Sequence, residues 1–172
     1  MTAPAVTAPF LAATFMLGAA GVAKIARPDD TARALRTAGL PFGRIAVRVG
    51  AVGEVAVAVA AVAVPGALTG GLVAVSYAAF ATFVILALRQ DWPLASCGCF
   101  GRPDTRPTAA HAGLNLGAAG IAVWWAVVAE GSVGDLFRTE PWGGWPLLLV
   151  TALISGLAYL VWTNPLTSGA AT

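Results

Sequence analysis

Five apolar stretches of about 20 residues, separated by short polar segments, constrain the fold of this chain more than any other feature. They cover residues 9–26, 45–64, 67–88, 109–129 and 142–162. As an α-helix, each is long enough to cross a hydrocarbon core of about 30 Å. Only 10% of the residues are charged, which is too few to cover a soluble globule. The sequence therefore predicts an all-α integral membrane helical bundle, with residues 1–172 forming a single membrane domain.

Basic residues are distributed unevenly among the polar segments. Residues 27–44 contain four arginines and residues 89–108 contain three, whereas residues 130–140 are mainly acidic. Because cytoplasmic loops of membrane proteins carry an excess of Lys and Arg, both basic segments are expected to face the cytoplasm. This alternation predicts a multi-pass protein of the cell membrane with its N-terminus outside and its C-terminus in the cytoplasm.

The first basic segment also predicts a short helix at the membrane surface. Asp29 or Asp30 is expected to cap its start, and Gly39 suits its end. Pro41 prevents the helix from continuing. The arginines of this helix would face anionic headgroups while its leucines enter the interface.

The two cysteines of the chain, Cys97 and Cys99, lie in the second basic segment with one glycine between them. They belong to the stretch Cys97-Gly98-Cys99-Phe100-Gly101. Because glycine bends freely, residues i and i+2 can approach the Cα separation of about 4.4 to 6.8 Å found in disulfides. Such a small ring is strained, which favours an exchanging redox pair over a structural crosslink. The alternative is two unpaired thiols in a tight turn.

No cofactor motif accompanies the cysteines. Two cysteines and one histidine would leave a closed zinc site without a clear fourth ligand, so no metal site is predicted. No haem, flavin or nucleotide signature is present either. A quinone is chemically compatible with a membrane redox protein, but nothing in the sequence supports one.

Glu54 is the second candidate for chemistry. It lies about 14 Å along the second apolar stretch, close to the bilayer centre. A carboxyl there costs several kcal/mol unless it is neutral, paired or hydrated. Two interpretations carry equal weight. Either Glu54 handles protons, or it forms a buried ion pair or hydrogen bond that fixes helix packing. The candidate partners are Lys24, Arg48, Tyr77 and Asn115.

His111 and Asn115 are four residues apart at the start of the fourth stretch, so they share a helix face. His111 lies about one turn from the cysteine segment and would handle protons for the thiols. The alternative is that His111 has no chemical role and that its side chain extends to the membrane interface.

Four stretches of this sequence together resemble the MauE family, the methylamine-utilisation membrane proteins grouped with the DoxX-like proteins. They are Ala-Gly-Val-Ala-Lys at residues 20–24, Ala-Gly-Leu-Pro at residues 38–41, the intramembrane Glu54, and Cys-Gly-Cys-Phe-Gly at residues 97–101. The resemblance covers about residues 10–128. It implies a four-helix core, to which the apolar stretch at 142–162 adds a fifth transmembrane helix.

By the same resemblance, Cys97 and Cys99 are the redox pair, and Lys24, Glu54 and Asn115 are polar positions of the family. Leu114 stands where many relatives carry an arginine, which weakens any anion-binding role there. The resemblance also implies a thioredoxin-like protein or another redox enzyme as partner, and it links the chain to methylamine metabolism.

The leading hypothesis is a thiol–disulfide redox or maturation factor of the membrane, and the alternative is a non-catalytic scaffold for a redox enzyme. Beyond the lipid bilayer and such a protein, no partner is indicated, since a net charge of +2 is too small to predict nucleic-acid binding. The predicted topology places the cysteines at the inner face, whereas disulfides of secreted enzymes form outside the cytoplasm. The pair would then exchange electrons at the inner face or relay them through a partner.

Overall fold

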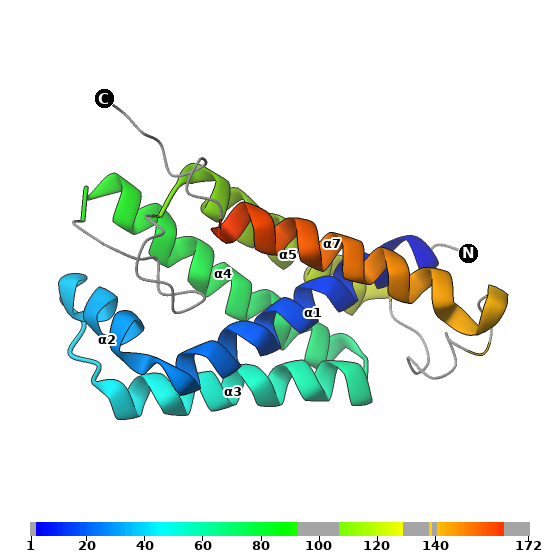
Figure 1. The fold of residues 1–172 in the computed structure, drawn as a ribbon, viewed down its shortest axis with the longest axis horizontal. Helices are drawn as coiled ribbons and strands as arrows, with labels where there is room; N and C mark the ends of the chain where they lie inside the picture. The colour runs from blue at the N-terminus through cyan, green and yellow to red at the C-terminus, as the bar shows by residue number, and fades with distance from the viewer. Residues whose placement is uncertain (1–2, 93–106, 129–137, 139–140, 164–172) are drawn as a thin grey trace.

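The computed structural model describes residues 3–92, 107–128, 138 and 141–163, and every regular element among them is a helix (Figure 1). The helices are α1 (Ala3–Ala26), α2 (Pro28–Thr37), α3 (Arg44–Ala63), α4 (Ala67–Arg89), α5 (Ala109–Val128), the 3-10 turn η1 (Pro141–Gly144) and α7 (Trp145–Thr163). Of these, α1, α3, α4 and α5 are long and apolar enough to cross a membrane. The predicted all-α membrane bundle with a four-helix core is confirmed.

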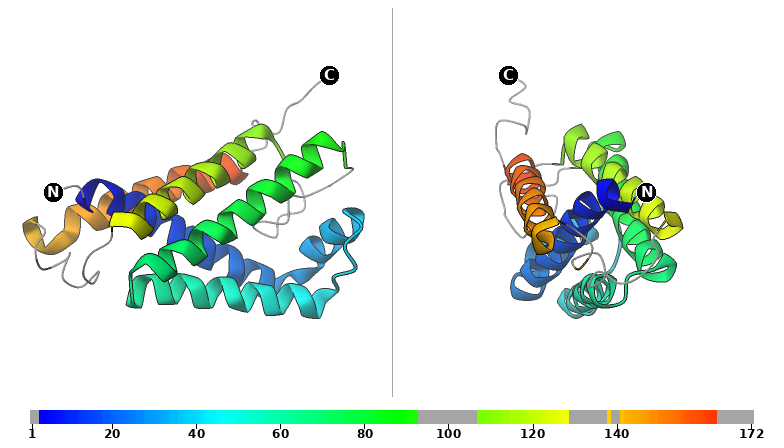
Figure 2. Two further views of the ribbon diagram at one scale, coloured as in Figure 1. Left: turned by 180° about the vertical axis from the view of Figure 1, so that it is seen from behind. Right: turned by 90° about the vertical axis from the view of Figure 1, so that its right-hand side faces the viewer.

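Helix α1 is the central helix of the bundle. About two thirds of its apolar span is buried, against a third or less for the spans of α3, α4 and α5. It packs along α3 and also contacts α5 and α7, whereas α4 packs chiefly on α5 (Figure 2). The four long helices therefore form two pairs, α1 with α3 and α4 with α5, held together by the side chains of α1.

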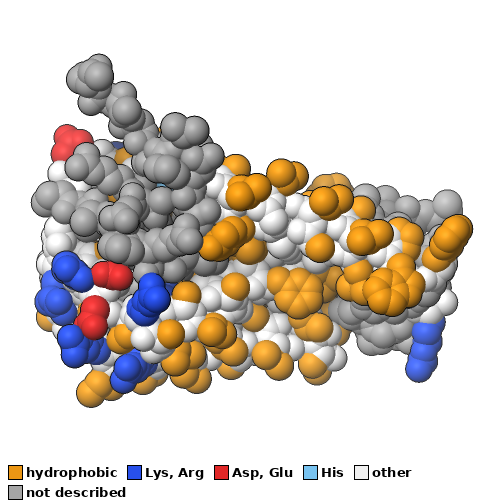
Figure 3. Space-filling model, viewed as in Figure 1, with side chains coloured by type: hydrophobic (Ala, Val, Ile, Leu, Met, Phe, Trp, Pro, Cys, Tyr) orange, Lys and Arg blue, Asp and Glu red, His pale blue; other side chains and the backbone are white. Residues whose placement is uncertain are grey.

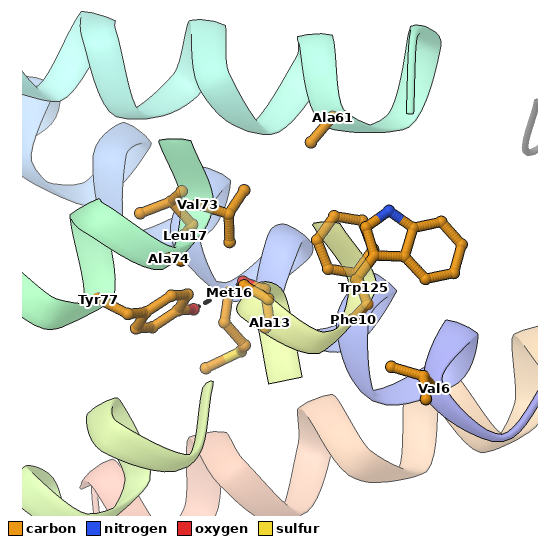
Figure 4. Packing of buried hydrophobic residues seen from close by; sticks show 11 residues of the cluster. Val6, Phe10, Ala13, Met16, Leu17, Ala61, Val73, Ala74, Tyr77 and Trp125 are labelled. Atoms are coloured by element: carbon orange, nitrogen blue, oxygen red, sulfur yellow. Dashed lines mark hydrogen bonds between the residues drawn. The ribbon is translucent and has the colours of Figure 1, made fainter. Parts of the chain in front are cut away.

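The core of the bundle is a cluster of aliphatic and aromatic side chains around α1 (Figure 4). Phe10 of α1 stacks on Trp125 of α5, with ring centroids 4.6 Å apart and planes 9° from parallel. The Tyr77 hydroxyl of α4 donates a hydrogen bond of 2.6 Å to the Ala13 carbonyl of α1. These two contacts fix α1 against the α4 and α5 pair.

The start of α1 differs from the prediction. The helix begins at Ala3 instead of residue 9, and Pro9 lies inside it. A proline inside a helix removes one backbone hydrogen bond. Val6 and Ala8 are buried against the bundle, so tertiary packing continues the helix on the N-terminal side of the proline.

The surface helix α2 forms where it was predicted, but its start is not capped by an aspartate. Pro28 occupies its first turn and no side chain caps the helix. Asp29 and Asp30 instead pair with Arg44 and Arg33, so the carboxylates serve ion pairs in place of the cap. Gly39 follows the helix with a φ of 76°, as expected for a helix end that glycine favours.

The predicted fifth membrane span corresponds to α7. Residues 141–144 form a 3-10 turn, and the apolar helix Trp145–Val161 that follows is shorter than the four long spans. It packs on α1 through Leu147, which contacts Ala8 and Leu11. Residues 145–161 are thus part of the bundle, and their crossing of the membrane stays a prediction.

The first basic segment and the described beginning of the second, residues 89–92, lie at the same end of the bundle. Helix α2 stands at the end where α4 finishes, and Trp92 packs there with Ala34 and Ala87 (Figure 1). Most charged side chains on the face shown in Figure 3 gather at this end, and apolar side chains cover much of the rest. The four long helices alternate in direction, as the predicted topology requires. The side of the membrane that this end faces stays a prediction.

Candidate functional site

The site begins with an ion pair inside the bundle. The Lys24 ammonium on α1 lies 2.7 Å from each of the two Glu54 carboxylate oxygens on α3. The side chains are 6% and 15% exposed, respectively, so both charges are largely removed from the surface. Of the four candidate partners for Glu54, the structure therefore selects Lys24.

A glycine brings these two side chains together. Gly21 lies one turn before Lys24 on α1, and a Cβ built on it would meet the Ala51 carbonyl oxygen and a Val55 methyl at 2.8 Å. The same Cβ would lie 3.2 Å from the Cβ of Glu54. Because only glycine permits this approach, α1 and α3 pack backbone to backbone at this level. Gly21 thus supplies the small residue that this contact between α1 and α3 needs.

Phe80 completes the surroundings of the ammonium. The Lys24 nitrogen lies 4.2 Å from the centre of the Phe80 ring on α4, a cation–π distance. An ammonium has three N–H donors, and two of them point to the carboxylate. The aromatic face therefore shields the remaining side of the charge. Nothing in the sequence marked Phe80, because one phenylalanine in an apolar helix carries no signal of its own.

Beside the ion pair lies a groove between α3 and α4, with a volume of about 590 Å³. Lys24 and Glu54 form its charged part, and Thr31 and Thr82 also line it. Apolar side chains supply most of the remainder, and α2 contributes Ala34 and Leu35. Sequence reasoning missed this groove because it depends on the divergence of α3 and α4, not on any one residue.

His111 and Asn115 form a second polar group at the start of α5. Both residues are only 1% exposed, which excludes His111 as a side chain reaching out to the membrane interface. The Thr108 backbone N–H donates to the His111 Nδ1 at 3.1 Å, and the Thr108 hydroxyl lies 2.7 Å from the same atom. Because Nδ1 accepts, a neutral imidazole carries its proton on Nε2. The Asn115 amide donates to the His111 carbonyl at 2.7 Å, which fixes this turn of helix.

The other predicted partners of Glu54 are engaged elsewhere. Tyr77 donates to Ala13, Asn115 donates to His111, and Arg48 is exposed at the charged end of α3. The predicted proton-handling residues thus lie in two separate groups, one on α1 and α3 and one on α5. Five predicted positions lie outside the residues that the structure describes: Cys97, Gly98, Cys99, Phe100 and Gly101.

Comparison with known proteins identifies the family. The model of the family described as methylamine utilisation protein MauE matches residues 1–128. No curated protein and no solved structure gives a significant match. The matched region contains α1 to α5, the Lys24 and Glu54 pair and both cysteines, and it ends where α5 ends. With about three quarters of its length matched, the chain belongs to the MauE family and is a multi-pass membrane protein.

Proposed function

We propose that this protein is a thiol–disulfide redox or maturation factor of the membrane that uses Cys97 and Cys99. The observation that carries the proposal is the occurrence of both cysteines of the chain in one Cys-Gly-Cys stretch. Membership of a family named for methylamine utilisation supports the further proposal that the partner is an enzyme of amine metabolism.

The reaction is an exchange with a partner dithiol. A thiolate of a thioredoxin-like partner attacks one sulfur of the Cys97–Cys99 disulfide, and the S–S bond of this pair breaks as a mixed disulfide forms. The second partner thiol then displaces the remaining cysteine. The partner loses two electrons and two protons as its own disulfide forms, and Cys97 and Cys99 gain both as free thiols. The reverse exchange delivers a disulfide.

His111 supports the thiolate in this exchange. It begins α5 within a few residues of Pro107, which follows the cysteine segment, and Thr108 fixes its Nδ1 as an acceptor. In this orientation the neutral imidazole presents its Nε2–H as a hydrogen-bond donor, which would stabilise a thiolate, because Nδ1, its one acceptor, is already engaged by Thr108. The start of α5 thus holds a candidate hydrogen-bond donor for a thiolate close in sequence to the two cysteines.

Thiol trapping in intact membranes tests the proposal. Cells are quenched with acid, free thiols are labelled with a maleimide of about 5 kDa, and the redox state is read from the shift on a gel. We expect a mixture of reduced and oxidised protein that changes when the partner is deleted, and a trapped mixed disulfide in one of the single variants Cys97→Ser and Cys99→Ser.

The double variant Cys97→Ser with Cys99→Ser separates the proposal from the alternative of a non-catalytic scaffold. We expect it to insert and to accumulate as the parent does while the maturation of the partner enzyme is lost. Full maturation by the double variant would refute the redox role and favour the scaffold.

A further inference from the structure

The groove between α3 and α4 has the dimensions of a small-molecule site. Its volume of about 590 Å³ falls within the range of about 300 to 1,000 Å³ that is typical of ligand pockets. Along α3 it extends from Ala46 to Glu54, which corresponds to about 12 Å of helix. It therefore starts near the charged end of the bundle and reaches the middle of the predicted span.

The groove is open along one side. Leu40, Phe42 and Leu86 line it and are all exposed, and so is Gly50 on the α3 wall. Helices α3 and α4 meet at their hairpin and separate toward the α2 end (Figure 2). Because both helices are apolar enough to lie in a bilayer, a molecule dissolved in the membrane can enter between them.

The charged part of the groove, the Lys24–Glu54 pair, determines which chemical group fits best. Lys24 directs its ammonium to Glu54 and Phe80, and its side chain is 6% exposed. Glu54 is the more accessible partner at 15%, and a carboxylate accepts about four hydrogen bonds, of which Lys24 supplies two. The Glu54 carboxylate can therefore accept a further hydrogen bond from a molecule in the groove.

We propose that the groove binds a membrane-soluble molecule with an apolar body and a hydroxyl group, the hydroxyl donating to the Glu54 carboxylate. A plain acyl chain fits less well, because it would place methyl groups against a buried ion pair and leave the carboxylate unsatisfied. A carboxylated lipid would bring a second negative charge to Glu54. The site does not depend on the thiol chemistry proposed above.

Two sources share this chemistry, phenolic ring compounds and aliphatic alcohols, and competition distinguishes them. The full-length protein is placed in phosphatidylcholine nanodiscs and labelled with 4-decylphenol that carries a diazirine and an alkyne in its chain. We expect saturable labelling that maps to α3 and α4. Competition by 4-decylphenol alone identifies a phenolic site, and equal competition by hexadecanol identifies an alcohol site. The methyl ether 4-decylanisole lacks the donor and should compete at least tenfold less.

Matched variants test whether the label occupies the groove. Gly50 lines the groove, Gly53 does not, and a Cβ on either would meet nothing within 4 Å. Gly50→Leu is expected to reduce saturable labelling at least tenfold and Gly53→Leu to leave it unchanged. On the opposite wall, Ala79→Leu and its neighbour Ala78→Leu form a second pair if Gly50→Leu does not fold.

The same labelling is expected in the variant that lacks both cysteines, so failure of the redox proposal leaves this one standing. Equal competition by 4-decylanisole would overturn the hydroxyl assignment. Unchanged labelling of both wall variants, Gly50→Leu and Ala79→Leu, would overturn the groove as the site.

Discussion

The ion pair between Lys24 and Glu54 allows a quantitative prediction about stability. At 2.7 Å and an effective dielectric constant of about 20, two unit charges attract by about 6 kcal/mol, and much of this is offset by their removal from water. Removing one partner leaves the other charge buried, which costs about 3 to 5 kcal/mol. We expect Lys24→Met and Glu54→Gln each to lower the free energy of unfolding by this amount.

The double variant carries the stronger test. With both charges gone, no buried charge lacks a partner, and replacement of a buried pair by uncharged groups is often neutral or stabilising. The free energy of unfolding of Lys24→Met with Glu54→Gln should therefore lie within about 1 kcal/mol of the parent. Because the two single losses sum to about 6 to 10 kcal/mol, the coupling free energy is about 5 kcal/mol or more. Unfolding is measured by denaturant titration of the protein in mixed micelles.

An exposed pair on α2 is the control. Arg33 and Asp30 lie 2.8 Å apart, but the Arg33 side chain is 67% exposed. Their removal should change stability by less than about 1 kcal/mol. Two results would refute the reasoning: unchanged stability of both single variants at the buried pair, or a double variant as unstable as the sum of the two.

Three further predictions concern the helix contacts and the topology. Gly21→Ala should lower stability by about 1 to 3 kcal/mol because its Cβ would lie 2.8 Å from the Ala51 oxygen, whereas Gly113→Ala, with open space around it, should be neutral or stabilising by up to about 1 kcal/mol. Equal effects in the same unfolding assay would contradict this account of the contact between α1 and α3. Tyr77→Phe should cost about 1 kcal/mol through loss of its bond to Ala13, and no measurable loss would count against it. A membrane-impermeant protease should cleave a tag at the N-terminus, but not one at the C-terminus, of intact cells; the reverse pattern would invert the topology.

The helical class and the positions of the four long spans could be predicted from the sequence. Apolar length and the intervening charges fix where each span begins and ends, and α3, α4 and α5 agree with the prediction within one residue at each described end. The start of α1 could not be predicted, because Pro9 is a local stop signal that packing of Val6 and Ala8 overrides. The central position of α1 could not be predicted either. A helix that is apolar on all sides can be surrounded by lipid or by protein, and its sequence does not distinguish the two.

To predict the site, the rotation of each helix about its own axis would have to be known, because rotation decides which side chains face one another. Lys24, Arg48, Tyr77 and Asn115 were all plausible partners for Glu54 by depth alone. Gly21 carried the decisive signal, because it lies three residues before Lys24 on the same helix face and marks where α3 approaches. The groove had no comparable signal, since it results from the spacing of two helices and not from a motif.

The choice of lysine at position 24, and not arginine, fits the geometry of the site. Lys24 is the one lysine of the chain, and the nine other basic residues are arginines, which lie in the polar segments or near the ends of the apolar stretches. A compact ammonium can be satisfied by one carboxylate and one aromatic face, as Glu54 and Phe80 provide. An arginine has five donors in a wide planar fork, and several would point into the apolar groove without partners. A buried pair beside an apolar groove therefore favours lysine, and it leaves the unused hydrogen-bonding capacity on the carboxylate, where a ligand hydroxyl can reach it.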